Sequence, residues 1–291
     1  MIFPTMDRIT SESAADYLSL TKPRTVALHL LTAAAAMFLA GNGRVNPDIL
    51  WLTLVGGGLI AASSNVLNCY FDCELDALMP RTRNRPLPSG RLQPASALYL
   101  ALATGLSGFS ILAFVGWLPL ILAMGGLVSY VFVYTLWLKR KTGWSAVFSS
   151  VVGAFPPLTG WAAVTGHLSL IPLLLMAIIA LWTVPHYWSL AMSKKMEYDA
   201  AGIPATPGSR TGWLMALSAF LLCLASVLLA QAADLGLAFI AASLIVGALL
   251  LALVLRYLTL ATVFTARHIY YGSIFYLVAL FTLILANSVL A

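Results

Sequence analysis

Charged residues are scarce in this chain. Asp, Glu, Lys and Arg make up only 9% of its 291 residues, whereas they make up about a quarter of ordinary soluble proteins. Hydrophobic residues account for 61%, and the mean hydropathy is +0.93. So little charge excludes a water-soluble core. It predicts an all-α, polytopic membrane protein that forms a single domain over residues 1–291.

Cysteine is scarce as well, with three residues in all. Cys69 and Cys73 end the second apolar run, on the side expected to face the cytoplasm, where thiols stay reduced, and Cys223 lies inside a later run. No disulfide is therefore expected. The two thiols four residues apart would share a helix face, but the hard carboxylates beside them favour Mg²⁺ over a soft metal, so packing is their expected role.

The N-terminal residues lack the features of a targeting peptide. Residues 1–20 carry Asp7, Glu12 and Asp16 against a single Arg8, without an apolar core. Secretory signals need such a core, and organelle transit peptides are rich in arginine and poor in acids. We therefore expect residues 1–20 to be a cytoplasmic segment of a protein in the cell (cytoplasmic) membrane of a bacterium or archaeon.

Apolar runs close to the roughly 20 residues needed to cross a bilayer recur along the chain. They predict nine transmembrane helices, of which the first is short and the fifth is interrupted by Pro156-Pro157. The predicted spans cover residues 25–40, 50–70, 95–115, 118–138, 145–164, 168–190, 212–232, 235–255 and 268–290.

The basic residues predict the orientation of these spans. If the N-terminus is cytoplasmic, all 16 Lys and Arg residues except Arg44 lie on the cytoplasmic side, as the positive-inside rule requires. Nine spans then place the C-terminus outside. The net charge of +6 is accounted for by this collar of basic residues. The lipid bilayer is therefore an expected partner, and nucleic acid is not.

The end of the second span carries the first polar motif. Asn68, Asp72 and Asp76 recur every four residues, so they lie along one stripe of a helix. Arg81 and Arg85 follow shortly after. Two carboxylates and an amide offer hard oxygen ligands for Mg²⁺, and arginines bind phosphate oxygens. The motif predicts diphosphate chemistry at a membrane surface.

The end of the sixth span carries a second polar motif. Here Pro185-His186-Tyr187-Trp188 is followed by Lys194-Lys195 and then by Glu197. His186 and Glu197 are eleven residues apart, close to three turns, so an unbroken helix would turn both the same way. Because this motif comes four spans after the first, the chain is compatible with a duplicated four-helix unit. We expect the two motifs to face each other across a cytoplasmic-side cavity.

Together these stretches resemble the motifs of the UbiA-like intramembrane prenyltransferases, and within them the protoheme IX farnesyltransferase family. The resemblance runs from about Leu18 to Pro207 and then weakens. It is carried by Asn68-x-x-x-Asp72-x-x-x-Asp76 with Arg81-Thr82-x-x-Arg85-Pro86-Leu87, Tyr134-Thr135-x-x-Leu138-Lys139-Arg140-x-Thr142, Pro156-Pro157-Leu158-x-Gly160-Trp161, and Pro185-His186-Tyr187-Trp188-x-Leu190-Ala191 with Glu197-Tyr198-x-x-Ala201-Gly202-x-Pro204.

The resemblance implies a fold and a reaction. It implies a UbiA-like bundle that transfers a farnesyl group from farnesyl diphosphate to a vinyl group of protohaem IX (haem b), with Mg²⁺ as cofactor. The product would be haem O for terminal oxidase assembly, so haem A synthase or oxidase assembly factors are the implied protein partners.

The resemblance also implies the site residues. Those implied as catalytic are Asp72, Asp76, Lys139 and Glu197, and those implied as metal ligands are Asn68, Asp72, Asp76 and Glu197. The diphosphate would be bound by Lys22, Arg81, Arg85, Tyr134, Lys139, Arg140, Lys194 and Tyr198, and the haem by His186, Tyr187 and Trp188. The family usually has Asp where Glu197 stands. Asp199 would be the alternative carboxylate if the helix unwinds there.

Two other interpretations remain open. A UbiA-like enzyme that acts on a quinone precursor or on chlorophyllide would use the same diphosphate site, although the Pro-His-Tyr-Trp sequence argues against it. An anion transporter would also have many spans with charges at one mouth. Transporter sites, however, lie near the membrane midplane on broken helices, whereas the charges here gather at one face.

Overall fold

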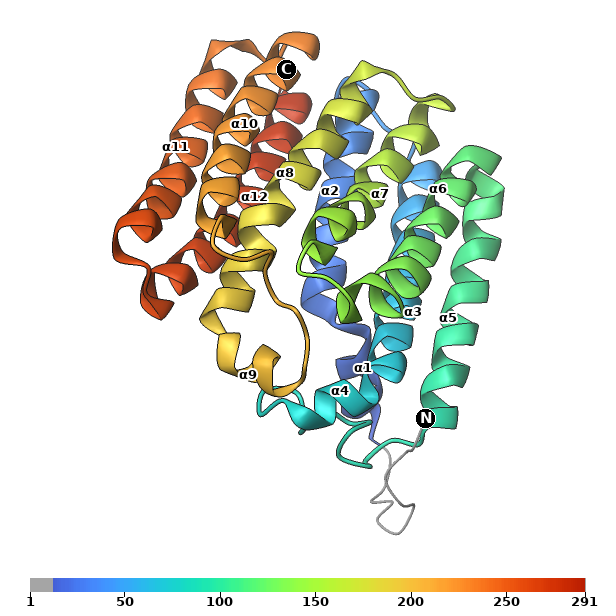
Figure 1. Ribbon diagram of the computed structural model, residues 1–291. Helices are drawn as coiled ribbons and strands as arrows, with labels where there is room; N and C mark the ends of the chain where they lie inside the picture. Colours follow the sequence, from blue (N-terminus) through green and yellow to red (C-terminus); the bar gives the residue numbers. More distant parts are fainter. Residues whose placement is uncertain (1–12, 291) are drawn as a thin grey trace.

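The computed structural model describes residues 13–290, and within them every regular element is a helix. Nine helical segments in this range are long and apolar enough to cross a membrane, which confirms the predicted number of spans. Figure 1 shows the long helices side by side, with the short helices α4 and α9 at one end of the bundle and the end of α12 at the other. The predictions made for residues 1–12 lie outside the described residues.

The elements follow the predicted spans closely. In chain order they are α1 (Ala14–Thr21), α2 (Pro23–Ala40), α3 (Pro47–Phe71), α4 (Cys73–Leu78), α5 (Pro94–Val115), α6 (Trp117–Val128), the π-helix η1 (Ser129–Thr135), the 3₁₀ turn η2 (Leu138–Arg140), α7 (Ser145–Thr165), α8 (Leu170–Ser193), α9 (Lys195–Ala200), α10 (Thr211–Ala232), α11 (Gly236–Leu260) and α12 (Val263–Leu290).

Local sequence signals explain where several helices begin. Pro23, Pro47 and Pro94 open α2, α3 and α5, where a proline loses no helical hydrogen bond. Asn46 caps α3 by accepting hydrogen bonds from the backbone N–H groups of residues 48 and 49. Lys22 separates α1 from α2 in a left-handed conformation, with φ of 51°. This bend places the Lys22 side chain at the end of the bundle.

The fifth span runs through Pro156-Pro157 without a break, so the predicted interruption is wrong. α7 is helical throughout its length. Two prolines remove two N–H donors, but neighbouring helices can hold such a backbone in place. α7 packs against α2, α6 and α8, and a Cβ at Gly160 would clash with the backbone oxygen of Ala33. Packing on several sides therefore outweighs the lost hydrogen bonds.

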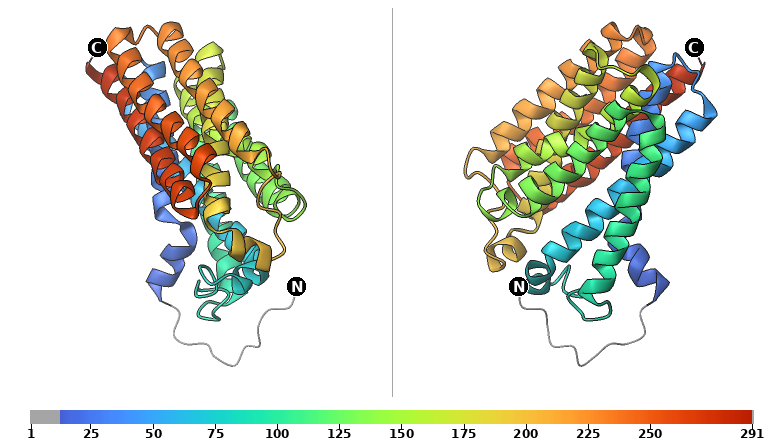
Figure 2. Two further views of the ribbon diagram at one scale, coloured as in Figure 1. Left: turned by 60° about the vertical axis from the view of Figure 1, so that its left-hand side comes forward. Right: turned by 90° about the vertical axis from the view of Figure 1, so that its right-hand side faces the viewer.

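Small residues bring several helices close together. α3 packs along α5, where Gly108 lies so near that a Cβ on it would sit 2.7 Å from the backbone oxygen of Gly56. In the second half α8, α10, α11 and α12 form the largest buried apolar cluster together with residues of α2 and α7, and α12 also packs against α2. Figure 2 shows these helices running roughly parallel in two further views. Lipid tails are as apolar as the side chains, so the hydrophobic effect does not drive helices together inside a membrane. Close van der Waals packing between the helices stabilises the bundle instead.

The two long helices that carry the polar motifs end in the same way. α3 stops at Phe71, Asp72 forms a one-residue break, and the six-residue α4 follows. α8 stops at Ser193, Lys194 forms the break, and the six-residue α9 follows. Both short helices lie at the same end of the bundle (Figure 1). The fold thus brings two polar helix ends together, four spans apart in the chain.

Candidate active site

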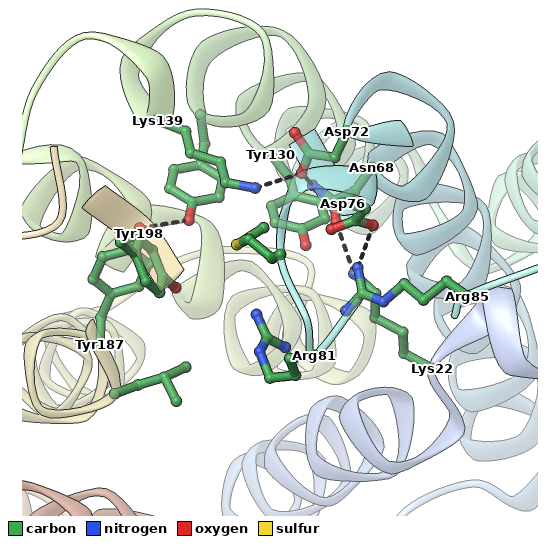
Figure 3. A pocket seen from close by; sticks show the side chains of 13 residues that line it. Lys22, Asn68, Asp72, Asp76, Arg81, Arg85, Tyr130, Lys139, Tyr187 and Tyr198 are labelled. Carbon is green, nitrogen blue, oxygen red and sulfur yellow. Dashed lines mark hydrogen bonds and ion pairs between the residues drawn. The ribbon is translucent and has the colours of Figure 1, made fainter. Parts of the chain in front are cut away.

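A pocket of about 170 Å³ lies at this end of the bundle. Figure 3 shows Asp72 and Asp76 on one side of it, with Tyr130 beside them, and Tyr187 and Tyr198 on the other. Its wall combines residues of both polar motifs, so the expectation that they meet at one cavity is confirmed for the pocket's lining. The lining residues are Lys22, Asn68, Asp72, Asp76, Met79, Arg81, Arg85, Tyr130, Tyr134, Lys139, Tyr187, Leu190 and Tyr198.

The acidic stripe survives the break between α3 and α4. The Asp72 backbone N–H donates to the Asn68 carbonyl at 2.9 Å, and the Asp76 N–H donates to the Asp72 carbonyl at 2.7 Å. The four-residue hydrogen-bond spacing of a helix therefore continues across the break. Asn68, Asp72 and Asp76 are 5%, 1% and 2% exposed. The stripe predicted from the sequence forms one buried face of the pocket.

Each polar group of this stripe contacts a cation from a different segment. Lys139 Nζ lies 2.6 Å from Asp72 Oδ2 at the end of the fourth span, and Arg85 Nη1 lies 2.5 Å from Asp76 Oδ2 in the loop after α4. Lys22 Nζ donates to Asn68 Oδ1 at 2.7 Å. Asp72 Oδ1 is buried and has no hydrogen-bond partner. Three cations thus converge on ligand atoms suited to a metal, and one buried oxygen is left open.

The surroundings shift the pKa values of two of these cations in opposite directions. Burial lowers the pKa of Lys22, and the opposing fields of Asp72 and Asp76 do not make up for it. Burial also works against the charge of Arg85, but the nearby acidic groups, Asp76 foremost, together outweigh it and raise the pKa of Arg85. The surroundings therefore favour the charged form of Arg85 and disfavour that of Lys22.

Tyrosines form the other side of the pocket. The Tyr134 hydroxyl donates to the Tyr187 hydroxyl at 3.2 Å, which joins η1 of the fourth span to α8. The rings of Tyr130 and Tyr134 stack with centroids 5.8 Å apart, and Tyr198 of α9 completes the wall. Tyr198 is 6% exposed, and burial raises its pKa, so it stays a neutral phenol. The wall is aromatic and neutral.

Three lining residues were absent from the sequence prediction. Tyr130 lies four residues before Tyr134, a spacing that would have indicated a shared face. Met79 and Leu190 are apolar and carry no signal that separates them from lipid-facing residues. Another aromatic near the first motif, Tyr70, packs beside the apolar cluster of α1, α3 and α5 and does not line the pocket.

Glu197, the carboxylate of the second motif, does not line the pocket itself but contacts a residue that does. Glu197 pairs with Lys194 at 3.0 Å, and its Oε2 lies 4.0 Å from Arg81 Nε. Glu197 and Lys194 are not among the lining residues, but Arg81 is, so it links Glu197 to the pocket. Asp199, the alternative carboxylate, is exposed and pairs with Lys195 at 2.6 Å. The structure therefore favours Glu197 over Asp199 as the carboxylate nearer the site.

His186 contacts α12, and the break at Lys194 separates its helix from the short helix that carries Glu197. His186 stacks between Trp182 and Tyr270, with ring centroids 4.4 and 4.9 Å away, and its Nδ1 lies 2.9 Å from the Ser273 hydroxyl of α12. The expectation that an unbroken helix would turn His186 and Glu197 the same way is therefore not met. The helix ends at Ser193, before Glu197 is reached.

Two more predicted site residues make structural contacts. Trp188 is 1% exposed and donates from Nε1 to the Gly143 carbonyl at 3.0 Å. Arg140 donates to the Phe71 carbonyl at 2.7 Å, at the C-terminus of α3. Tyr187 is the member of the predicted haem contacts that lines the pocket. The pocket thus gathers ten of the predicted site residues, and the other five are not among its lining residues, namely Arg140, His186, Trp188, Lys194 and Glu197.

The donor set suits a hard cation that is also bound by substrate. Among the described residues no group of three or more His, Cys, Asp or Glu side chains is placed to hold a metal ion. Asn68, Asp72 and Asp76 offer one amide and two carboxylates. Mg²⁺ is commonly held by one or two carboxylates and completed by water and substrate phosphates. The open Asp72 Oδ1 fits such a site, and the buried thiols of Cys69 and Cys73 pack in the α1–α3–α5 cluster.

Sequence comparison shows which proteins this chain is similar to. It is 48% identical over 198 residues to a protoheme IX farnesyltransferase of Thermosynechococcus vestitus, and 50% identical over 192 residues to one of Synechocystis sp.. These matches cover 68% and 66% of this chain but only 62% and 61% of the relatives, so the chain spans about three fifths of their length. A protoheme IX farnesyltransferase of Symbiobacterium thermophilum is 41% identical over 246 residues, which is 83% of each chain.

Solved structures share the fold. A digeranylgeranylglyceryl phosphate synthase superposes with a TM-score of 0.80 at 16% identity over 95% of this chain and 99% of its own. A UbiA homologue from Archaeoglobus fulgidus, bound to GPP and Mg²⁺, has a TM-score of 0.65 at 16% identity over 92% of this chain and 99% of its own. The model of the UbiA prenyltransferase family matches residues 29–275. This chain therefore belongs to the UbiA prenyltransferase family.

Proposed function

We propose that this protein transfers a farnesyl group from farnesyl diphosphate to a vinyl group of haem b, which gives haem O. The observation that carries the proposal is the pocket in which Asn68, Asp72 and Asp76 meet cations on one side and tyrosines on the other. The names of the sequence relatives support the reaction, and the fold neighbour bound to GPP and Mg²⁺ supports a prenyl diphosphate as donor. The chain acts as a single prenyltransferase domain.

Asn68, Asp72 and Asp76 would hold Mg²⁺, with Glu197 as a further carboxylate beside Arg81. When bound, Mg²⁺ neutralises negative charge that develops on the diphosphate oxygens. The carboxylates contribute the negative charge that draws a divalent cation to a site otherwise rich in Lys and Arg. The Asp72 and Asp76 carboxylates pair with Lys139 and Arg85, so a carboxylate that held the ion would leave its cation available to the substrate.

The basic side chains stabilise the leaving group. As the bond between farnesyl C1 and oxygen breaks, its electron pair goes to the diphosphate, and Lys22, Arg81, Arg85 and Lys139 line the space where that charge grows. Cations held in place in a buried pocket stabilise such charge far more than they would in water. Arg81 and Arg85 also suit bidentate contact with phosphate oxygens. The site therefore favours departure of diphosphate.

The tyrosines of the pocket would stabilise the positive charge that develops on the farnesyl group. The allylic carbon that loses diphosphate is cationic, and the faces of Tyr130, Tyr134 and Tyr187 attract a cation. The vinyl group of haem then bonds to C1, and water adds to the resulting carbocation and loses a proton, which leaves a hydroxyethylfarnesyl group. Tyr187 places α8 at the pocket, so we propose that haem approaches along α8, with His186 and Trp188 near its edge.

We also propose the orientation and partners that follow from this reaction. The pocket end carries the Lys139–Arg140 and Lys194–Lys195 pairs and the arginines after α4, so it faces the cytoplasm and the C-terminus lies outside. The cell membrane is the proposed location. Haem O made there would pass to haem A synthase or to assembly factors of terminal oxidases.

The test is to supply purified protein in lipid vesicles with Mg²⁺, farnesyl diphosphate and one acceptor at a time. The acceptors are haem b, a quinone precursor and chlorophyllide, and mass spectrometry of the extracts reads the product. We expect hydroxyethylfarnesyl haem from haem b alone. Prenylation of another acceptor only would assign a different UbiA-type reaction, and diphosphate uptake into vesicles without any product would indicate a transporter.

A further inference from the structure

Asn68 has an amide whose two ends are almost the same size but chemically opposite. Its Oδ1 accepts a hydrogen bond from Lys22 Nζ at 2.7 Å, and its Nδ2 donates to Asp72 Oδ2 at 2.8 Å. The same Nδ2 donates to the Thr135 hydroxyl at 3.0 Å. An ammonium group only donates and a carboxylate only accepts, so all three neighbours agree on one orientation. Only Oδ1 can serve as a metal ligand.

Two of these three neighbours would gain a new partner in the proposed reaction. Lys22 would turn to the diphosphate, and the Asp72 carboxylate would be shared with Mg²⁺, so neither would orient the amide as firmly while substrate is bound. Thr135 is uncharged and 0% exposed, and it does not line the pocket. It is therefore the neighbour that neither the diphosphate nor the metal would engage directly.

The π-helix η1 holds the Thr135 hydroxyl in the required direction. Thr135 Oγ1 donates its proton to the Tyr130 carbonyl, five residues earlier, at 2.8 Å. The backbone N–H of Leu136 likewise donates to the Val131 carbonyl at 3.0 Å, the same five-residue spacing. With its proton used in this way, Oγ1 presents a lone pair to Asn68. Short π-helical turns of this kind often occur at functional sites.

We propose that Thr135 is a positioning residue that holds the Asn68 amide with Oδ1 turned into the pocket. The inference rests on the proposed metal-dependent function, and it assigns a reason for the π-helix at this point of the fourth span. Without the hydroxyl, the amide loses the acceptor that neither ligand competes for, and rotation of the amide would point the Nδ2 protons at the cation site. A partner one step behind a metal ligand typically accounts for about 10–100-fold in metal affinity or activity.

Thr135→Val and Thr135→Ser separate the hydroxyl from the packing. Valine keeps the branched shape and loses the oxygen, whereas serine keeps the oxygen and loses a methyl group. Thr32→Val is the matched control, because Thr32 is 2% exposed in α2 and its hydroxyl bonds only to the His29 carbonyl. Mn²⁺ binding, measured by electron paramagnetic resonance on protein saturated with inorganic diphosphate, reads the site without turnover.

We expect Thr135→Val to weaken Mn²⁺ binding by about 10–100-fold, with Thr135→Ser close to wild type and Thr32→Val unchanged. The Mg²⁺ concentration for half-maximal farnesyl transfer should rise in Thr135→Val by a similar factor. Wild-type Mn²⁺ affinity in Thr135→Val, or equal losses in the Val and Ser variants, would overturn the inference. Failure of the wild-type protein itself to bind Mn²⁺ would overturn the metal site as a whole, and Thr135's role with it.

Discussion

Replacing Asp72 with asparagine tests the acidic stripe, because it removes one charge and keeps the size of the side chain. In the structure Asp72 Oδ2 accepts from Lys139 at 2.6 Å and from Asn68 at 2.8 Å. Asparagine can replace one of these contacts but cannot balance the lysine charge. We expect turnover to be almost abolished in a protein that still folds.

The magnitude follows from burial. The Asp72 and Lys139 side chains are 2% and 13% exposed, and removing one partner of a buried ion pair costs about 3–5 kcal/mol, since the other charge is left unpaired. Loss of one electrostatic group from an active site costs a further factor of about 10² to 10³ in kcat. The Lys195–Asp199 pair is 70% and 56% exposed, a setting in which a pair is worth about 0–1 kcal/mol. Asp199→Asn is therefore the control.

A double variant separates stability from catalysis. In Asp72→Asn with Lys139→Met the unpaired lysine is gone, and neutral replacements for a buried pair are often tolerated. We expect the thermal unfolding midpoint to recover toward wild type while farnesyl transfer stays lost. The assay compares unfolding midpoints in detergent with initial rates over a range of Mg²⁺ concentrations, with EDTA as the metal-free limit.

Three outcomes would refute this reasoning. Asp72→Asn that keeps more than about a tenth of wild-type kcat/KM would contradict the expected loss of at least 10²-fold. Recovery of activity together with stability in the double variant would mean that Asp72 serves the fold alone. Full activity in EDTA would remove the metal from the proposal.

Three further predictions follow from the site and the fold. Glu197→Gln should impair Mg²⁺-dependent transfer far more than Glu197→Asp, because the charge beside Arg81 matters more than the length of the arm; a large loss only in Asp199→Asn would identify Asp199 as the ligand. Burial lowers the pKa of Lys22, so turnover should fall with rising pH before the ordinary lysine value of 10.5, and Lys22→Arg should move that fall to higher pH; an unmoved limb in the pH profile would contradict this. Gly160→Ala should lower the unfolding midpoint by forcing α7 away from α2, at a cost of about 1–3 kcal/mol; the helical Gly57→Ala, which meets nothing within 4 Å, should not, and equal effects would argue against the close approach.

Short-range chemistry made much of this protein predictable from its sequence. Each span has to bury about 20 apolar residues, so its place in the chain follows from composition alone. The stripe of Asn68, Asp72 and Asp76 depends only on helical spacing, and it survives the break because the backbone hydrogen bonds continue across it. The family motifs that predicted the reaction could also be recognised from the sequence, because the residues of each motif lie close together in the chain.

The tertiary structure decided which groups meet. Spacing along one helix does not reveal that Thr135 reaches Asn68 across 67 residues, because that contact depends on the packing of two helices and on a π-helical turn. It also does not reveal the break at Lys194, which puts Glu197 on a separate short helix beside Arg81, or the helix packing that brings His186 against α12. Helix faces follow from local geometry, but the neighbours of each face, and hence the partners of every buried charge, are set by how the whole bundle packs.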